Sequence, residues 1–360
     1  MTAALGSPLI RVLESAGAVT GDYHGVRVAR HFGDPRAEYV AATEGAAVLD
    51  RSHRTRLLVE GRAPRRMLNG IVTGTVPDRP DTPANGGSRG RASYSCVLTS
   101  KGRMITDLWC LCRGEGESES FLLDVPVAGA AGLMDNLHKV LPPRFAAVED
   151  VSSRTAMISV VGPEAPRLTS RLAVGLRVDA SDLTSLEEGE WRASGTSADE
   201  GLTVVRTGDV WPEAYNILGP VGPVTALWTA LVEAGARPAG LGVWSTLRVE
   251  AGRPAFGVDM DEATIPVEAG IHERAIDHGK GCYTGQEVIV RIRDRGHVNR
   301  HLRQLHLGDV PTPPRGTELF VPGEDKPVGV VTSAVESPRF GEVVALGYVR
   351  RGVVGEPAPR

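Results

Sequence analysis

Residues 280–287 read Lys-Gly-Cys-Tyr-Thr-Gly-Gln-Glu, and the eight positions after them combine apolar side chains with arginines. This pattern predicts an amphipathic helix that begins near Thr284, which would place Cys282 at or just before its N-terminus. Unpaired backbone N–H groups and the helix dipole favour an anion there, and Lys280 acts in the same direction. We therefore predict a reactive Cys282, with Lys280 favouring its thiolate. The alternative is a small buried cysteine, which is the commoner fate of this residue type.

Segment 280–287 resembles the signature of the folate-binding YgfZ family, relatives of the glycine-cleavage T-protein that act in the assembly and repair of iron–sulfur clusters. The resemblance implies tetrahydrofolate or a one-carbon derivative as cofactor, and iron–sulfur client or assembly proteins as partners. It also implies that Tyr283 and Gln286 shape the folate pocket. The chemistry of Cys282 stays open between attack on a one-carbon or sulfur species and transient ligation of iron.

The arginines that follow, Arg291 among them, have two interpretations. A run of charge is most simply a solvated helix face. Beside a folate site, the same arginines suit the carboxylates of a glutamate tail, which a guanidinium can bind through two parallel hydrogen bonds.

Composition indicates a soluble globular protein of two or three domains, because 360 residues with 41% hydrophobic content suffice for a large core. The net charge of −4 gives no global positive field, so no nucleic-acid partner is expected. No apolar stretch is long enough for a membrane span, and Met1–Gly17 lacks a signal-peptide pattern, which predicts no membrane association and a cytoplasmic location. Four cysteines without a C-x-x-C pair fit a reducing compartment, and no metal site is predicted.

Short strands alternate with helices of ten to fifteen residues, which indicates an α+β or α/β fold, and strands beyond Gly296 suggest a small barrel. Resemblance to the T-protein extends over nearly the whole chain, including residues 46–53, 59–61, 68–74, 206–208, 246–252 and 266–270. It implies an α+β cloverleaf of three domains. The first α/β domain is discontinuous and comprises residues 1–50 and 150–240. The second is also discontinuous and comprises residues 51–149 and 241–292. The third domain, residues 293–360, is a C-terminal β-barrel.

The T-protein resemblance also assigns folate contacts. Glu213 is the candidate carboxylate for the amino group and ring N–H of the pterin, with an ordinary exposed acid as the alternative. At position 244 the T-protein has an arginine that contacts folate, whereas this chain has Trp244, which can stack on a pterin or benzoyl ring but cannot form that ion pair. Arg248 and Glu250, in a Leu-Arg-x-Glu-Ala-Gly motif, are the other two residues that the resemblance assigns to folate binding in this part of the chain.

One departure from the T-protein bears on function. Its strand after a hairpin turn carries two adjacent aspartates, one of them important for catalysis on the folate-bound one-carbon unit, whereas this chain has Thr106-Asp107. The main hypothesis is therefore a tetrahydrofolate-binding accessory factor for iron–sulfur clusters that acts through Cys282. The alternative is a folate-dependent aminomethyl- or methyltransferase that uses Asp107 as acid/base or charge-stabilising group. A third is a ligand-sensing or scaffold protein that binds folate but forms or breaks no covalent bond.

Three local predictions can be compared with the structure. Asp34-Pro35 is expected to start a helix. Cys110 and Cys112 are expected to share one face of a strand and to pack in the core, rather than bind a metal. Residues 77–92, rich in proline, glycine and polar residues, are expected to form a flexible surface loop.

Overall fold

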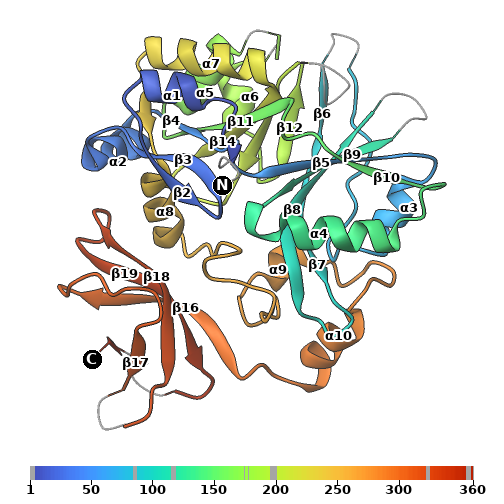
Figure 1. Ribbon diagram of the computed structural model, residues 1–360, viewed down its shortest axis with the longest axis vertical. Coiled ribbons are helices and arrows are strands. Elements are labelled where there is room, and N and C mark those ends of the chain that lie inside the picture. Colours follow the sequence, from blue (N-terminus) through green and yellow to red (C-terminus); the bar gives the residue numbers. More distant parts are fainter. Residues whose placement is uncertain are drawn as a thin grey trace. The chain divides into compact units, whose positions relative to one another are not determined.

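The structure is a computed structural model that describes residues 5–83, 87–114, 119–173, 175–176, 178–194, 201–321, 325–353 and 358–359. The chain divides into two compact units. Unit 1 comprises residues 1–68, 76–94 and 108–244, and unit 2 comprises residues 69–75, 95–107 and 245–360. Figure 1 shows the elements of both, coloured along the chain. Within the described ranges, no helix combines the length and apolarity that crossing a membrane requires.

A seven-stranded sheet forms the centre of unit 1, in the order β15-β4-β11-β14-β13-β12-β6. Only its β15–β4 pair is parallel among the pairings described. The strands are β4 (Ala47–Asp50), β6 (Ser88–Arg91), β11 (Thr155–Val161), β12 (Glu190–Ala193), β13 (Thr203–Thr207), β14 (Ala214–Pro220) and β15 (Arg237–Ala239).

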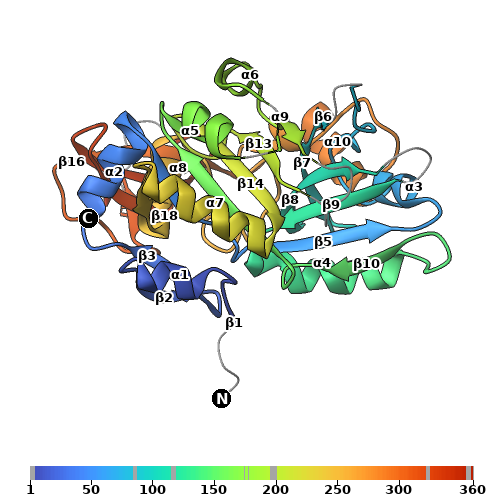
Figure 2. The same cartoon turned by 90° about the horizontal axis from the view of Figure 1, so that it is seen from above.

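Five helices pack on this sheet or on its neighbouring elements in unit 1. They are α1 (Ile10–Ser15), α2 (Pro35–Glu44), α5 (Ala165–Leu172), α6 (Ala180–Thr184) and α7 (Val221–Glu233). Helix α7 packs on β11 and β14, and Figure 2 shows it beside β14. Its Leu227 and Leu231 belong to the same buried cluster as Ile158 of β11 and Ile217 of β14. Burial of such side chains is the main favourable contribution to folding of this unit.

A second sheet has the order β10-β5-β9-β8-β7, and the boundary between the units falls within β7 and β8. Its strands are β5 (Thr55–Glu60), β7 (Ser93–Leu98), β8 (Met104–Arg113), β9 (Ser120–Val125) and β10 (Ala147–Asp150), with α3 (Pro64–Asn69) and α4 (Val127–Val140) nearby in sequence. Cys110 and Cys112 are fully buried on β8. Their predicted core packing is confirmed. A small third sheet contains β1 (Leu5–Gly6), β2 (Val19–Tyr23) and β3 (Val26–His31).

The C-terminal part of unit 2 is a five-stranded sheet in the order β16-β19-β18-β17-β20. Its strands are β16 (Arg300–Gly308), β17 (Glu318–Phe320), β18 (Gly329–Ser337), β19 (Glu342–Arg350) and β20 (Ala358–Pro359). Four of them contribute to one core, through Leu305, Leu319, Val331 and Ala345, which agrees with the predicted barrel-like domain. Unit 2 also contains α9 (His272–Ala275), α10 (Gln286–Arg295) and the end of α8 (Leu241–Glu250). The division into three domains stays a prediction.

Two local predictions have opposite outcomes. Asp34 caps α2, because its Oδ1 accepts a hydrogen bond from the Ala37 amide at 3.0 Å, with Pro35 as the first helical residue. The flexible loop predicted over 77–92 is wrong for residues 88–91, which form β6 and pair with β12. Gly90 lets Trp191 lie against this strand, since a Cβ at position 90 would come within 2.7 Å of the indole. Residues 84–86 lie outside the described residues.

Candidate functional site

Cys282 lies on an exposed loop of unit 2, whereas Cys96, Cys110 and Cys112 are buried. The helix that follows, α10, begins at Gln286, two residues later than predicted. Its N-cap is Gly285, whose φ of 84° is left-handed, so the chain turns there before the helix starts. Cys282 therefore lies in the loop before Gly285 and Gln286 and not at the N-terminus of α10. The predicted position of Cys282 at the helix N-terminus is wrong.

Close packing explains this glycine. A Cβ at Gly285 would lie 2.6 Å from the carbonyl oxygen of Thr99, in the turn between β7 and β8. Similarly, a Cβ at Gly102 of the same turn would lie 2.8 Å from the Cβ of Val288 in α10. The two glycines thus let the hairpin turn and the start of α10 meet closely, which fixes where the Cys282 loop enters the helix.

Lys280 fastens the same loop to the segment at residues 72–75. Its ammonium donates hydrogen bonds to the carbonyl oxygens of Val72 and Gly74, both at 2.8 Å. The Asp277 carboxylate accepts a hydrogen bond from the Thr75 hydroxyl at 2.7 Å, and this bond is the main cause that lowers the pKa of Asp277. These contacts give Lys280 a positioning role. Its predicted influence on the thiolate of Cys282 stays a prediction.

The other predicted residues of this segment differ in exposure. Tyr283 is buried, and burial raises its pKa to about 12, so the phenol is neutral at ordinary pH. Its ring centroid lies 5.7 Å from the Lys280 ammonium. Gln286 is half-buried at the start of α10, and Arg291 is exposed on the same helix. Their predicted contacts with folate stay predictions.

Asp107 occupies a buried position on β8, with 7% of its surface exposed. The preceding Thr106 is fully buried, and its hydroxyl donates to the Asp107 carbonyl oxygen at 2.9 Å. Burial, and then the charge of Asp107, raise the pKa of the Cys96 thiol well above its usual value. Asp107 therefore lies close to a neutral, buried thiol, and the position of the missing second aspartate is a threonine turned to the backbone.

Arg248 and Glu250 take part in a buried polar network of unit 2. The Arg248 guanidinium donates to Asp259 Oδ2 at 2.6 Å and to the Ser333 hydroxyl at 2.8 Å. The Glu250 carboxylate accepts from the Ser337 hydroxyl at 2.5 Å. Because Ser333 and Ser337 lie on β18, these bonds hold the end of α8 against the barrel-like sheet. Both residues thus have a structural role, and their predicted contact with folate stays a prediction.

In unit 1, Trp244 stacks against an arginine that the sequence interpretation did not single out. The Cζ of Arg51 lies 3.5 Å from the centroid of the Trp244 ring, and both residues are buried. Burial is the main cause that lowers the pKa of Arg51 to about 9. The only signal in the sequence was a charged residue inside the segment Asp50-Arg51-Ser52-His53, so the contact itself depends on the fold.

His53 is the second residue that sequence reasoning missed. It is 7% exposed, and its Nδ1 has no hydrogen-bond partner in the described part of the chain. Burial, followed by the charge of Arg51, lowers the pKa of His53 well below 6.5, so the imidazole is neutral. Tyr23 of β2 meets it edge to face, with 5.2 Å between ring centroids.

Glu213 lies half-buried just before β14, also in unit 1. The Tyr215 hydroxyl has two acceptors within hydrogen-bond distance, the Leu183 carbonyl oxygen at 3.1 Å and Glu213 Oε2 at 3.4 Å. Arg206 lies over the Tyr215 ring, 5.1 Å from its centroid. A carboxylate held this loosely can still accept two donors from a planar ligand.

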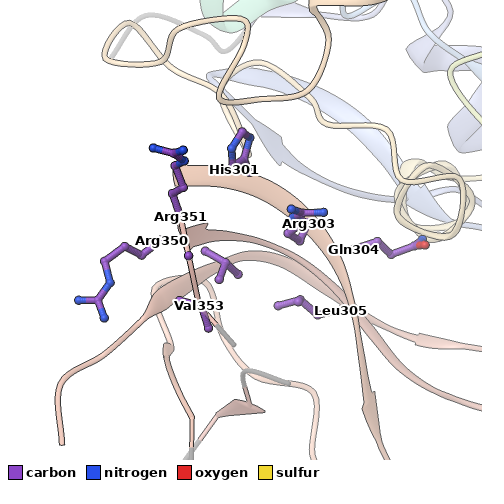
Figure 3. Close-up of a pocket in the computed structure, with 9 residues that line it drawn as sticks. His301, Arg303, Gln304, Leu305, Arg350, Arg351 and Val353 are labelled. Carbon is purple, nitrogen blue, oxygen red and sulfur yellow. The ribbon is translucent and has the colours of Figure 1, made fainter. Parts of the chain in front are cut away.

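Three of the arginines after residue 290 lie in different surroundings. Arg293 pairs with the adjacent Asp294, and Arg300 pairs with Glu268. Arg303 instead lines a pocket of about 350 Å³ on the barrel-like sheet, shown in Figure 3. The figure shows the guanidinium groups of Arg303, Arg350 and Arg351 pointing in different directions. Among the described residues, no group of His, Cys, Asp and Glu side chains could hold a metal ion.

Comparison with known proteins identifies the family. The model of the GCVT N-terminal domain matches residues 9–280, and that of the glycine cleavage T-protein C-terminal barrel domain matches residues 300–357. The chain is 30% identical to an aminomethyltransferase of Rubrobacter xylanophilus, over 95% of this chain and 86% of the relative. It is 33% identical to an aminomethyltransferase of Nitrosococcus oceani, with the same two shares covered.

A solved structure has the same fold. The crystal structure of the glycine cleavage system aminomethyltransferase T from Bartonella henselae superposes with a TM-score of 0.82, at 22% identity, over 96% of this chain and 90% of that chain. The α+β T-protein architecture predicted from the sequence is therefore confirmed. With one family model covering most of the chain and another its C-terminal sheet, this chain belongs to the glycine cleavage T-protein family.

Proposed function

We propose that this chain binds tetrahydrofolate or a one-carbon derivative, and that it acts through Cys282 as an accessory factor of the YgfZ type for iron–sulfur clusters in client enzymes. The observation that carries the cysteine-centred role is the setting of Cys282: an exposed thiol on a loop that Lys280 and Asp277 fasten in place. A fixed, accessible thiol suits a nucleophile or a transient iron ligand, whereas a structural cysteine is normally buried.

Folate binding is supported by unit 1. Glu213 offers a half-buried carboxylate to the amino group and ring N–H of a pterin, which form a planar pair of donors. Trp244 contributes an aromatic wall. His53 and Arg51 carry buried nitrogen atoms for which the described residues provide no partner. This mixture of an acid, aromatic rings and buried nitrogen atoms without a partner fits a polar aromatic ligand such as a folate. Tetrahydrofolate would supply the carrier of a one-carbon unit.

A second function, aminomethyl or methyl transfer, is favoured by the names of the relatives, which are aminomethyltransferases. It would use Asp107 to stabilise charge or to move a proton. The observation against it is that Thr106 replaces the neighbouring acid and turns its hydroxyl to the backbone. At about 30% identity the relatives share the family, and the reaction is argued from the residues of the site. The cytoplasm stays the predicted location.

Calorimetric titration of the purified chain with 5-formyltetrahydrofolate tests the folate site. We expect Glu213→Gln to weaken binding by about tenfold to a hundredfold, because one partner of a charge-assisted pair of hydrogen bonds is lost. Glu233→Gln, at the exposed end of α7, is the matched control and should bind as the wild type does. Absence of folate binding by the wild type would refute the proposal.

An enzymatic assay separates the two functions. The wild type, Asp107→Asn and Cys282→Ser are each incubated with tetrahydrofolate and an aminomethylated lipoyl carrier, and the methylenetetrahydrofolate formed is measured. Transfer by the wild type that is lost in Asp107→Asn and retained in Cys282→Ser would establish the transferase in place of the accessory factor. We expect no turnover from any of the three proteins.

A further inference from the structure

Two buried arginines lie close together in the sequence of unit 1 and differ sharply in their partners. Arg56 of β5 is 1% exposed, and its guanidinium is fully engaged by the protein. It donates to the hydroxyl of Thr155 and to the carbonyl oxygens of Ser52, Arg54, Ser152 and Thr155. Arg56 therefore has a structural role, because its hydrogen bonds join the start of β5 to the segment that leads into β11.

Arg51 is also buried, at 5% exposure, but it lacks such bonds. Its Nε and Nη1 atoms are buried and have no hydrogen-bond acceptor within the described parts of the chain. The contact that the guanidinium does make is with Trp244, through the face of the ring at 3.5 Å. Stacking of this kind fixes the plane of a guanidinium and leaves its N–H groups, which lie in that plane, able to donate sideways.

Nearby acids do not complete the site. Asp209 and Asp124 act on Arg51 through charge, and neither accepts a hydrogen bond from its Nε or Nη1 atom. Both oxygens of Asp124 accept from Arg54 Nε, at 2.7 and 2.9 Å. A buried guanidinium with unsatisfied N–H groups costs free energy of folding. Residues that lower stability in this way are typical of binding sites, where the ligand supplies the missing partner.

We propose that Arg51, held flat against Trp244, donates hydrogen bonds to an oxygen atom of the bound folate, either the pterin carbonyl or a carboxylate of the glutamate tail. The inference rests on the proposed function, which places Trp244 at the folate site. It deepens that function by assigning the cation of the site to the loop between β4 and β5. Arg51 then discriminates in favour of ligands that present an oxygen acceptor at the edge of the Arg51–Trp244 stack.

The test compares Arg51→Met with Arg56→Met by two measurements on the full chain, urea unfolding and calorimetric titration with 5-formyltetrahydrofolate. Methionine keeps the length of the aliphatic side chain and removes the charge. Arg51→Met should leave the unfolding midpoint unchanged or raise it, and should weaken folate binding by at least tenfold. Arg56→Met should lower the midpoint, because it removes the buried hydrogen bonds that the Arg56 guanidinium donates.

The possible results separate this inference from the function on which it rests. If the wild type binds no folate, both the proposed function and the role of Arg51 are refuted. If the wild type binds and Arg51→Met binds equally well, only the role of Arg51 is refuted. A midpoint for Arg51→Met as low as that of Arg56→Met would also overturn the inference, since it would make Arg51 a structural brace.

Two fragments distinguish the possible acceptor oxygens. 6-Methyltetrahydropterin carries the pterin carbonyl without the glutamate tail, and p-aminobenzoylglutamate carries the carboxylates without the pterin. A loss of affinity in Arg51→Met for the first fragment identifies the pterin carbonyl, and a loss for the second identifies a carboxylate. Equal affinity of wild type and variant for both fragments contradicts the proposal.

Discussion

Replacement of Lys280 by methionine tests whether this residue holds the Cys282 loop in place. The change removes two hydrogen bonds of 2.8 Å to the carbonyl oxygens of Val72 and Gly74, both in buried residues. A hydrogen bond to a charged group contributes about 1.5 to 3 kcal/mol. Because Lys280 is half-buried, the lower end applies to each bond, so the loss should destabilise the loop by about 3 kcal/mol.

Hydrogen exchange followed by mass spectrometry measures this effect locally. A loss of about 3 kcal/mol corresponds to faster amide exchange by a factor on the order of 100, if the loop opens independently of the rest of unit 2. The peptide covering residues 277–285 should show it, since the Asp277 amide donates to Thr73 and the Thr284 amide to Gly70. Lys101→Met, an exposed lysine in the turn after β7, is the control. Exchange in Lys280→Met that matches this control would refute the positioning role of Lys280.

Two further predictions concern stability. The pKa of His53 lies well below 6.5 in the folded chain, so the unfolded chain binds the extra proton below that pH. The free energy of unfolding should therefore fall with decreasing pH, by up to about 1.4 kcal/mol per pH unit. In urea titrations at several pH values, His53→Asn should reduce this slope. Identical slopes for variant and wild type would contradict a neutral, buried His53. Gly285→Ala should lower the urea midpoint of unfolding, because alanine is strained at a φ of 84° and its Cβ would lie 2.6 Å from the Thr99 oxygen. A midpoint equal to that of the wild type would contradict the requirement for glycine at this turn.

Regular elements with a strong local pattern could be predicted from the sequence. Helix α2, for example, begins at its Asp34 cap, with Pro35 as its first residue. Strand β6 could not be predicted, because Ser88-Arg89-Gly90-Arg91 has no alternation of apolar residues. It exists through pairing with β12, which is a tertiary effect that local propensity does not contain.

The candidate site divides in the same way. Cys282 was predicted to be reactive from its place at a helix N-terminus and from Lys280, and this reactivity stays a prediction. The structure places Cys282 on an exposed loop before α10. The start of α10 was placed too early, because the pattern of side chains does not reveal that Gly285 must turn away from the Thr99 carbonyl. The stack of Arg51 on Trp244 joins residues from distant parts of the chain. Only the fold brings them together, so a lone charged residue after β4 gave no indication of its partner.

Genetic complementation tests the central claim most directly. The wild type, Cys282→Ser, Asp107→Ala and the control Thr284→Ala are expressed at matched levels in cells deleted for this gene, and the activity of an iron–sulfur enzyme is measured. Cys282 and Thr284 are both exposed, so neither substitution should disturb folding by more than about 0.5 kcal/mol. We expect Thr284→Ala and Asp107→Ala to restore the activity and Cys282→Ser to fail. Full rescue by Cys282→Ser would contradict the cysteine-centred function.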